Sequence, residues 1–491
     1  MHSKSVFMFS VQKNIQDKKE YESVLAFGDY QIKYCDTTPM MRACSGDREL
    51  LVYGYAVDVR NGTSDMLADL VLSGTKTITD VISYEANLGG KYLLFYKDAN
   101  GMYVIPDATA SIPFCYTTEG VEFLCASNSE YISKQLFIQP DEQLLKIRQN
   151  GELSQAMPYN LTIYREIEQL LPNHYFSFED RKAFRFVNYT ERFSLKSPKE
   201  VAEFTAPMIE KLMRFYYGKF KLYCPITSGR DSRVVLSFLL SADAKTETYT
   251  IKHQSFREDE PDVIIPVEIA RMANITNKQI LDVEPGEQLC EAFDDAFGNT
   301  GYSNRTLMIA NTVYSAFGDG AVINGDSIGQ VGKCSLHRDI PEFLATARYF
   351  RCKLHNYSKE SLFYIRQWIK DIRKSGEKVN LFDLFSMESR MGRWAAQENI
   401  VYGMIGQHYL NIFNSRSIIY PWTMVPRKDR KLSKIHLALI HIKYPSLLEV
   451  PFEGVRSKFE SIAKKNGLTY YFASFVKYYI QKFQFKRRDK V

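Results

Sequence analysis

The sequence lacks any uninterrupted apolar run of about 18 residues, the length that a helix needs to cross a bilayer. Its first residues, Met-His-Ser-Lys-Ser-Val-Phe-Met-Phe, contain too short an apolar stretch for a signal peptide, and no small-residue cleavage site follows. Low-complexity tracts are also missing, and 45% hydrophobic with 24% charged residues is typical of a globular protein. We therefore expect a cytoplasmic protein without a transmembrane segment.

Cysteine is scarce and irregularly spaced. The 491 residues include 8 cysteines, with no Cys-x-x-Cys pair and no Cys/His cluster of the spacing that zinc sites use. We interpret them as buried free thiols.

The excess of positive charge is small, and the formal net charge is +6. Much of the excess lies in residues 482–490, which read Lys-Phe-Gln-Phe-Lys-Arg-Arg-Asp-Lys. A basic aromatic segment of this kind could contact an anionic membrane or RNA. Because charge runs are usually solvated, we interpret it as a helix end followed by a frayed terminus. No nucleic-acid motif accompanies it, so we expect no nucleic-acid partner.

The length favours two domains. The first part contains short runs rich in aromatic and β-branched residues, separated by Asn-Gly, Asp-Ala and Glu-Gly turns, which predict an antiparallel sheet region. These runs cover residues 51–58, 90–97, 101–107, 111–118 and 121–127, with a further pair of strands within 173–187. The polar stretch from Asn188 to Lys199 is interpreted as the linker, which gives domains at 1–190 and 200–491.

Beyond the linker the periodicity alternates between helix and strand. Helices are predicted at 197–217, 232–242 and 262–273, and strands at 219–226, 246–251, 279–283 and 321–324. Such alternation predicts a parallel sheet with helices on both faces. From Pro341 to the end the sequence is mainly helical in pattern.

The most informative stretch joins the first of these strands to its helix. After Leu222-Tyr-Cys-Pro-Ile it reads Thr227-Ser228-Gly229-Arg230-Asp231-Ser232. At such a junction the unpaired N–H groups of the first helical turn and the positive end of the helix dipole favour a polyphosphate. Asp231 is placed to hold a magnesium ion that accompanies the phosphates. The alternative is an ordinary Ser/Asp helix cap after a buried strand.

This loop resembles the S-G-G-x-D-S motif of the ATP pyrophosphatase (PP-loop) family, in its asparagine synthetase-like branch. Thr227 and Ser228 replace the first Ser and first Gly, Gly229, Asp231 and Ser232 match, and Arg230 fills the variable place. The resemblance implies that Thr250 and Ile251, which end the second strand, lie at the adenine pocket. It also implies that Gly325 and Asp326, in Asn-Gly-Asp-Ser-Ile-Gly-Gln, stand for the family's G-x-G-x-D-E loop, although its Asp-Glu pair is not reproduced.

The first part of the chain resembles the class II amidotransferase-like domain of the same family. The matching stretches are Gly90 to Tyr96, Ile105 to Tyr116, Ser127 to Glu130 and Leu171-Pro-Asn-His-Tyr175. The resemblance implies an Ntn hydrolase-like α+β domain, followed by an α/β PP-loop (HUP-like) domain with a mostly helical C-terminal part. The family's N-terminal Cys nucleophile is replaced by Met1-His2, and no Asn-Gly-Glu stretch precedes Gly90, so we expect no glutaminase activity.

The resemblance implies an ATP- and Mg-dependent ligase that forms an amide through an acyl adenylate. The loop residues bind ATP, Asp231 and Asp326 bind Mg²⁺, and Arg230 with Lys428 are the candidate catalytic cations. The carboxylate substrate is a small molecule or a sugar acid of a surface polysaccharide, and the nucleophile is ammonia or an amine of the substrate. A lasso-peptide or β-lactam synthetase type of cyclase, a catalytically degenerate binding or regulatory protein, and a homodimer stay open.

A helix predicted from Leu381 to Ala396 resembles the family helix that lines the acceptor side. Arg390 and Arg393, three residues apart, are expected to face one way and could hold a substrate carboxylate or phosphate, although an ordinary pair on a helix surface is more common. Glu388 and Trp394 lie on the same helix, and Asn411, Asn414 and Arg416 form a second polar group. His436 and His441 have no metal-ligand spacing and are interpreted as ordinary helix residues.

Overall fold

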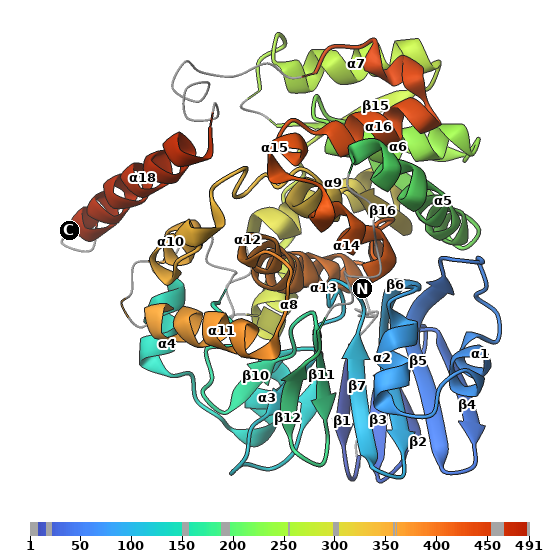
Figure 1. The fold of residues 1–491 in the computed structure, drawn as a ribbon, viewed down its shortest axis with the longest axis vertical. Helices are drawn as coiled ribbons and strands as arrows, with labels where there is room; N and C mark the ends of the chain where they lie inside the picture. The colour runs from blue at the N-terminus through green and yellow to red at the C-terminus, as the bar shows by residue number, and fades with distance from the viewer. Residues whose placement is uncertain are drawn as a thin grey trace.

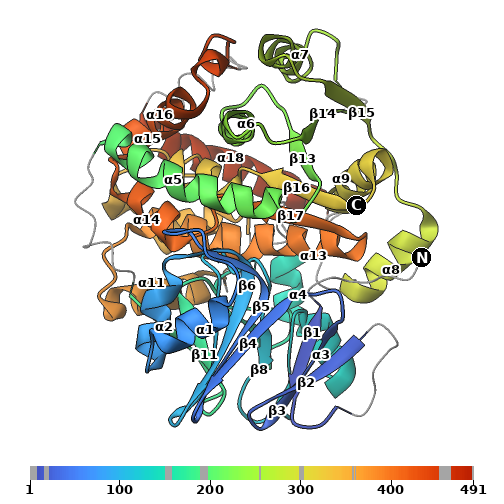
Figure 2. The same ribbon diagram turned by 90° about the vertical axis from the view of Figure 1, so that its right-hand side faces the viewer.

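The computed structural model describes residues 8–15, 22–149, 157–187, 197–253, 256–297, 304–356, 359, 361–452 and 466–488. Most of the predicted linker, the Met1-His2 start and the side chains beyond Gln484 lie outside this description. Figures 1 and 2 show antiparallel strands gathered at one end of the molecule and the helix-rich remainder above them.

Residues 8–187 form two antiparallel sheets of six strands each. The first has the order β10-β8-β9-β1-β3-β2 and the second β12-β11-β7-β6-β5-β4. The strands are β1 (Phe9–Gln12), β2 (Glu22–Phe27), β3 (Tyr30–Cys35), β4 (Met40–Ser45), β5 (Arg48–Asp58), β6 (Leu88–Asp98), β7 (Gly101–Pro106), β8 (Cys115–Thr117), β9 (Cys125–Ala126), β10 (Ile167–Gln169), β11 (His174–Ser177) and β12 (Lys182–Arg185).

Period-two alternation explains how these sheets are covered. On β5, Leu51 and Tyr53 pack between the two sheets, whereas Leu50 and Val52 pack on the opposite face against α1 (Leu67–Ser73) and α2 (Ile78–Glu85). The outer face of the first sheet is covered by α3 (Ser129–Leu136), and α4 (Glu142–Gln149) follows. The result is a helix-sheet-sheet-helix arrangement.

Residues 197–488 are built around a parallel five-stranded sheet with the order β15-β14-β13-β16-β17. Its strands are β13 (Leu222–Pro225), β14 (Thr246–Lys252), β15 (Asn277–Leu281), β16 (Gly320–Asn324) and β17 (Gln407–Asn411). Helices α5 (Pro198–Tyr217), α6 (Asp231–Ser241), α7 (Pro261–Ala273) and α16 (Lys434–Lys443) pack on one face. The other face is covered by α8 (Glu287–Phe297), α9 (Asn304–Phe317) and α13 (Ala396–Met404).

The remaining helices extend this part of the chain. They are η2 (Ile328–Gly332), η3 (Glu342–Leu344), α10 (Ala347–Lys353), α11 (Ser361–Ser375), α12 (Leu381–Phe385), η4 (Ser386–Ala395), α14 (Arg416–Met424), α15 (Arg427–Arg430), η5 (Pro445–Leu448) and α18 (Gly467–Arg488). Two of them, η2 and η4, are π-helical, a geometry often found at functional sites. No described helix is both long and apolar enough to span a membrane.

The predicted order of antiparallel sheets followed by a parallel sheet is confirmed. Helix α5 begins as expected, because Ser197 and Glu200 form a reciprocal capping box with the backbone. The strands before residue 48 were not predicted, because β2 and β4 are half-exposed edge strands with little apolar alternation. The predicted helix 381–396 changes to π-helix at Ser386.

Candidate functional site

The loop predicted from the sequence lies where the parallel sheet reverses its strand order. Strand β13 pairs with β14 on one side and with β16 on the other, so its carboxyl end adjoins the end of β16. In open α/β sheets, ligands bind in the crevice at this reversal point. The structure therefore brings loop 226–230 and the loop after Asn324 together at one edge of the sheet.

Hydroxyl groups of the first loop cap its own N–H groups. The hydroxyl oxygens of Thr227 and Ser232 lie 2.8 Å apart, and the Thr227 N–H donates to Ser232 Oγ at 3.3 Å. The Gly229 N–H donates to Thr227 Oγ1 at 3.2 Å. Asp231 is the first residue of α6, so these groups surround the positive end of an 11-residue helix.

Ser228, which stands where the family has glycine, is completely buried. Its N–H and its hydroxyl both donate to Asp262 Oδ1, at 3.1 and 2.6 Å. Asp262 lies in the first turn of α7 and ties this helix to the loop. The serine hydroxyl is thus directed to Asp262, while Thr227 is exposed.

The second loop touches the first through two glycines. A Cβ on Gly325 would lie 3.2 Å from the Asp231 carbonyl oxygen, and one on Gly329 would lie 2.8 Å from Asp231 Oδ2. Side chains at these positions would push on the aspartate, so glycine is required for the close approach.

Asp231 is held in an electropositive setting. His436 Nε2 lies 2.7 Å from Asp231 Oδ1, and Lys333 Nζ lies 3.8 Å from Oδ2. Burial opposes ionisation of Asp231, but the His436 hydrogen bond and the charges of Lys333 and Arg230 outweigh it and lower the Asp231 pKa. Burial lowers the pKa of His436, and the contact with the Asp231 carboxylate opposes this shift. The structure thus gives His436 a specific contact that the sequence did not predict.

A second acidic group lies beside the first. The Tyr409 hydroxyl donates to Asp326 Oδ2 at 3.1 Å and also hydrogen-bonds Glu398. Burial raises the pKa of Asp326, and the negative charge of Asp231 raises it further. Burial and the charge of Asp326 raise the pKa of Glu398. Glu398, 72 residues beyond Asp326 in sequence, is therefore a second carboxylate close to Asp326.

Arg390 is the cation beside these two carboxylates. It lowers the pKa of both, and its guanidinium lies 5.1 Å from the centre of the Trp394 ring. Among the described residues, Nε and Nη1 of Arg390 are buried without a hydrogen-bond partner. An anion such as a carboxylate would accept a charge-assisted hydrogen bond from one of these two donors.

The expectation that Arg390 and Arg393 face one way is wrong. Arg393 donates to Gln169 and to the Leu161 carbonyl oxygen, in the antiparallel part of the chain. In a π-helix, with more than four residues per turn, positions three apart do not share a face. Glu388 also contacts the antiparallel part of the chain, where its carboxylate pairs with Arg185 at 2.6 Å. The same carboxylate accepts a hydrogen bond from the Trp368 ring N–H at 2.7 Å.

The other predicted residues lie at varying distances from this site. Thr250 Oγ1 donates to the Ile226 carbonyl oxygen just before the loop, and Ile251 follows it on β14. The Arg230 guanidinium lies over the Phe452 ring at 4.8 Å. Lys428 is exposed on α15, and no described interaction joins it to the loop. Lys333 is the lysine that contacts Asp231, and no motif in the sequence pointed to it.

A small cavity opens between the two parts of the chain, next to Asp326. Its volume is about 20 Å³, enough for one water-sized molecule. The lining residues are Gly90, Lys91, Thr109, Ser111, Asn324, Asp326, Met391, Ala395, Asn399, Tyr409, Asn411 and Asn414. Burial lowers the pKa of Lys91 to about 7, so about half of this lysine is uncharged at neutral pH.

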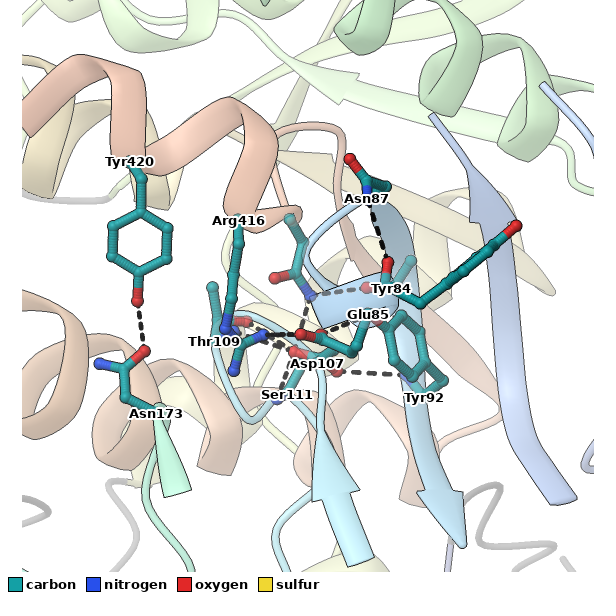
Figure 3. A network of polar contacts seen from close by, with 12 residues as sticks. Tyr84, Glu85, Asn87, Tyr92, Asp107, Thr109, Ser111, Asn173, Arg416 and Tyr420 are labelled. Atoms are coloured by element: carbon teal, nitrogen blue, oxygen red, sulfur yellow. Dashed lines mark hydrogen bonds and ion pairs between the residues drawn. The ribbon is translucent and has the colours of Figure 1, made fainter. Parts of the chain in front are cut away.

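A polar network joins the two parts around this cavity (Figure 3). Asp107 is completely buried and accepts from the N–H groups of Tyr92, Thr109 and Ser111. Asn414 adds donors to Asp107 at 2.9 Å and to the Gly90 carbonyl oxygen at 2.6 Å. Figure 3 also shows Arg416 reaching from α14 to Glu85, where Arg416 Nη1 lies 2.6 Å from each carboxylate oxygen. In the same view the Tyr420 hydroxyl points to the Asn173 side chain. These contacts give Asn414 and Arg416 an anchoring role.

The expectation of buried thiols is wrong for Cys44, which is exposed, whereas Cys115 and Cys125 are buried and poorly suited to nucleophilic chemistry. Burial raises the pKa of the Cys115 thiol to about 12 and that of Cys125 well above its ordinary value. Strand β1 begins at Phe9, and Met8 precedes it. Met8 and Phe9, at the start of β1, are both apolar.

Asp231 and Asp326 are few ligands for a metal site that is built from protein side chains alone. Among the described residues, no group of three or more His, Cys, Asp or Glu side chains could hold a metal ion. Mg²⁺ differs from other metals in this respect, because it is usually bound by one or two carboxylates together with substrate phosphates and water. Asp231 and Asp326, whose charges repel each other, fit that donor set.

No protein-family model and no curated protein matches the chain. Solved structures that align with it include a glutamine phosphoribosylpyrophosphate amidotransferase from B. subtilis complexed with ADP and GMP. That alignment has 12% identity, covers 63% of this chain and 64% of that chain, and has a TM-score of 0.20. A second, the allosteric regulatory enzyme of purine biosynthesis, has 11% identity, 72% and 65% coverage, and a TM-score of 0.22. The chain spans less than two thirds of either, and TM-scores this low carry no argument.

Proposed function

We propose that this protein is an asparagine synthetase-like ligase that uses ATP and Mg²⁺ to form an amide through an acyl adenylate. One observation carries the proposal: a hydroxyl-lined loop opens α6 at the point where the sheet reverses, with Asp231 and Asp326 beside it. In this proposal residues 1–190 are an Ntn hydrolase-like, amidotransferase-like domain and residues 200–491 a PP-loop (HUP-like) domain.

The loop would hold the triphosphate with its backbone and hydroxyls. The Thr227 and Gly229 N–H groups now donate to side-chain hydroxyls within the loop. Phosphate oxygens can replace these acceptors, and the end of the α6 dipole would favour their charge. Ser228 does not oppose this role, because its hydroxyl is directed to Asp262. The nearby Gly325, Thr250 and Ile251 complete the proposed nucleotide site.

Asp231 and Asp326 would hold the magnesium ion, with Glu398 near them. A divalent cation neutralises the charge that develops on the phosphates. The same cation would relieve the repulsion that raises the Asp326 pKa. This fit to two carboxylates is the structural support for Mg²⁺ as the cofactor.

The chemical step follows from the proposed ligands. An oxygen of the substrate carboxylate attacks the α-phosphorus of ATP, pyrophosphate leaves, and the amine then displaces AMP from the acyl carbon. Lys333 and Arg230 are the cations closest to Asp231, so we assign them the stabilisation of phosphate charge. Arg390, with two unsatisfied buried nitrogens, would hold a carboxylate of the acceptor.

The interdomain cavity suits a small nitrogen nucleophile. It holds one water-sized molecule and is lined by asparagine side chains and by Asp326. We propose ammonia, or an amine of the substrate, as the nucleophile and no glutaminase activity, and burial keeps the Cys115 and Cys125 thiols protonated. A sugar acid of a surface polysaccharide is the proposed carboxylate, by analogy with the family.

A binding or regulatory protein is the second candidate. The observation that favours it is the capping of three loop N–H groups, those of Thr227, Ser228 and Gly229, by side chains of the protein. A loop closed in this way could bind nucleotide without turnover. A cyclase of the β-lactam or lasso-peptide type differs from the main proposal only in its acceptor.

ATP–pyrophosphate exchange tests the proposal. With Mg²⁺ and a panel of uronic acids, amino acids and linear peptides, one class of carboxylate is expected to stimulate exchange. Asp231→Asn should lower the rate by about 10²–10³-fold, the usual loss when a group that stabilises transition-state charge is removed. Asp259→Asn, at an exposed aspartate, is the matched control and should exchange normally.

Three outcomes separate the candidates. Exchange with sugar acids supports the main proposal, and exchange with peptides supports a cyclase. ATP binding without exchange for any carboxylate supports the binding protein. Full exchange in Asp231→Asn would contradict the assignment of the metal site.

A further inference from the structure

The C-terminal helix α18 has apolar residues on two faces, one packed on described parts of the chain and one largely exposed. Its inner face packs on α10 and the segment after it: the Tyr471 ring lies 5.1 Å from Tyr349, and the Tyr478 hydroxyl donates to the Asn356 carbonyl oxygen at 2.8 Å. Lys353 Nζ also donates to the Tyr470 hydroxyl at 3.1 Å. Figure 1 shows α18 at the margin of the molecule, beyond α10.

The outer face of α18 carries a stripe of large apolar side chains. They recur at helical spacing and are between 48% and 64% exposed: Leu468, Phe472, Val476, Tyr479, Ile480 and Phe483. The helix has 22 residues and is about 33 Å long, so the stripe follows most of its length. A continuous apolar stripe of this size on a monomer marks an interaction site.

Positive charge lies on α18 itself and in a groove beside it. The sequence of α18 contains five Lys or Arg residues and no Asp or Glu. Beside the helix, α10 and α11 border a groove of about 920 Å³ that includes Tyr479 of the stripe. Five exposed basic residues line it, and none of the described residues that line it is acidic: Arg348, Arg366, Lys370, Arg373 and Lys374.

We infer that the outer face of α18 and the adjoining basic groove dock on the surface of an anionic lipid bilayer. A helix with an apolar face and flanking Lys and Arg residues lies in the membrane interface, where apolar burial and attraction to anionic headgroups act together. A second copy of the chain fits less well, because two such faces would bring like charges together. RNA also fits less well, because Leu468, Val476 and Ile480 cannot stack on bases.

This docking does not depend on the proposed ligase activity. It adds a peripheral membrane contact to a chain in which no described helix can span a membrane. It also revises the interpretation of the basic segment as merely a solvated helix end, because residues 482–488 belong to a helix with an exposed apolar face.

Sedimentation with vesicles tests the inference in the full chain. The protein should sediment with vesicles of equal parts phosphatidylglycerol and phosphatidylcholine, and far less with phosphatidylcholine alone. Raising NaCl to about 0.5 M, where the Debye length is about 4 Å, should weaken the binding. The double variant Phe472→Ser/Phe483→Ser should lower the partition coefficient at least about tenfold.

Two further variants separate docking from folding. Arg366→Gln/Arg373→Gln changes α11 and not α18, and should lower binding to the anionic vesicles by about tenfold. Phe137→Ser, at an aromatic residue that is 85% exposed on the antiparallel part, is the matched control and should bind normally. Circular dichroism of all variants should match the parent protein.

Specific results would overturn the inference. One is equal sedimentation with both kinds of vesicle, or none with either. Another is a dimer in light scattering that Phe472→Ser/Phe483→Ser dissociates while vesicle binding stays absent. A third is tight binding of an RNA oligonucleotide that the same variants abolish, again without vesicle binding.

Discussion

Buried carboxylates between the two parts of the chain and those beside the phosphate loop are paired differently. Between the parts, Asp107 accepts from several N–H groups, and Glu85 and Glu388 each face an arginine. Beside the loop, the charges of Asp326 and Glu398 repel each other, and both are attracted to Arg390. The first set holds the two parts together, while the second set retains charge that a cation and a carboxylate substrate would neutralise.

The largest effect is expected from breaking the ion pair between Arg416 and Glu85. Arg416→Met leaves Glu85 buried without its cation, which should lower the free energy of unfolding by about 3–5 kcal/mol. Denaturant unfolding measures the loss. Arg60→Met removes a pair whose arginine is 48% exposed and should cost less than about 1 kcal/mol.

The Arg416→Met variant should also change how the stability depends on pH. Burial raises the pKa of Glu85 to about 7 even beside Arg416, from an ordinary value of 4.5. The folded state therefore binds the Glu85 proton more tightly than the unfolded state, and stability falls as pH rises above 4.5. Without Arg416 this fall should continue to higher pH. A loss that is no larger at pH 8.5 than at pH 6 would contradict the buried-charge explanation.

The next effect concerns Lys91, which lines the cavity that adjoins both groups of carboxylates. Because its pKa falls from 10.5 to about 7 on folding, the unfolded state binds more protons between these values, and stability should rise from pH 7 to pH 10. Lys91→Met should raise the free energy of unfolding at pH 7 by about 2–4 kcal/mol and flatten this rise.

Activity measurements on Lys91→Met sharpen the comparison. If the cavity serves the amine step, the stabilised variant should form less amide while exchanging pyrophosphate normally. If Lys91→Met is stabilised and still forms amide at the parent rate, Lys91 contributes neither to stability nor to the amine step.

A smaller effect is expected from Gly329→Ala, which tests the contact between the two loops. The added Cβ would lie 2.8 Å from Asp231 Oδ2 and displace this carboxylate. Affinity for Mg–ATP should fall about tenfold, since misplaced ligands weaken a preorganised site. Gly286→Ala, where nothing lies within 4 Å, is the control. Equal ATP affinity of the two variants in calorimetry would rule out a role for the Asp231 position.

Local patterns in the sequence predicted the framework of the site well. The strand, loop and helix from Leu222 to Ser241 follow from a buried run, small hydroxyl residues and an apolar helix face. Lys333 and Glu398 could not be predicted, because they reach the site through π-helix η2 and through α13, far from the loop in sequence. The separate directions of Arg390 and Arg393 depend on π-helical geometry, which has no simple sequence signal.

Calorimetric titration with ATP, with and without Mg²⁺, tests the central claim most directly, because it needs no knowledge of the acceptor. Mg²⁺ should raise the ATP affinity of the parent protein at least about tenfold, by about 1.4 kcal/mol. Asp231→Asn and Asp326→Asn should each abolish that increase, with ATP alone still bound. An ATP affinity that is the same with and without Mg²⁺, or a Mg²⁺ effect unchanged in both variants, would contradict the account.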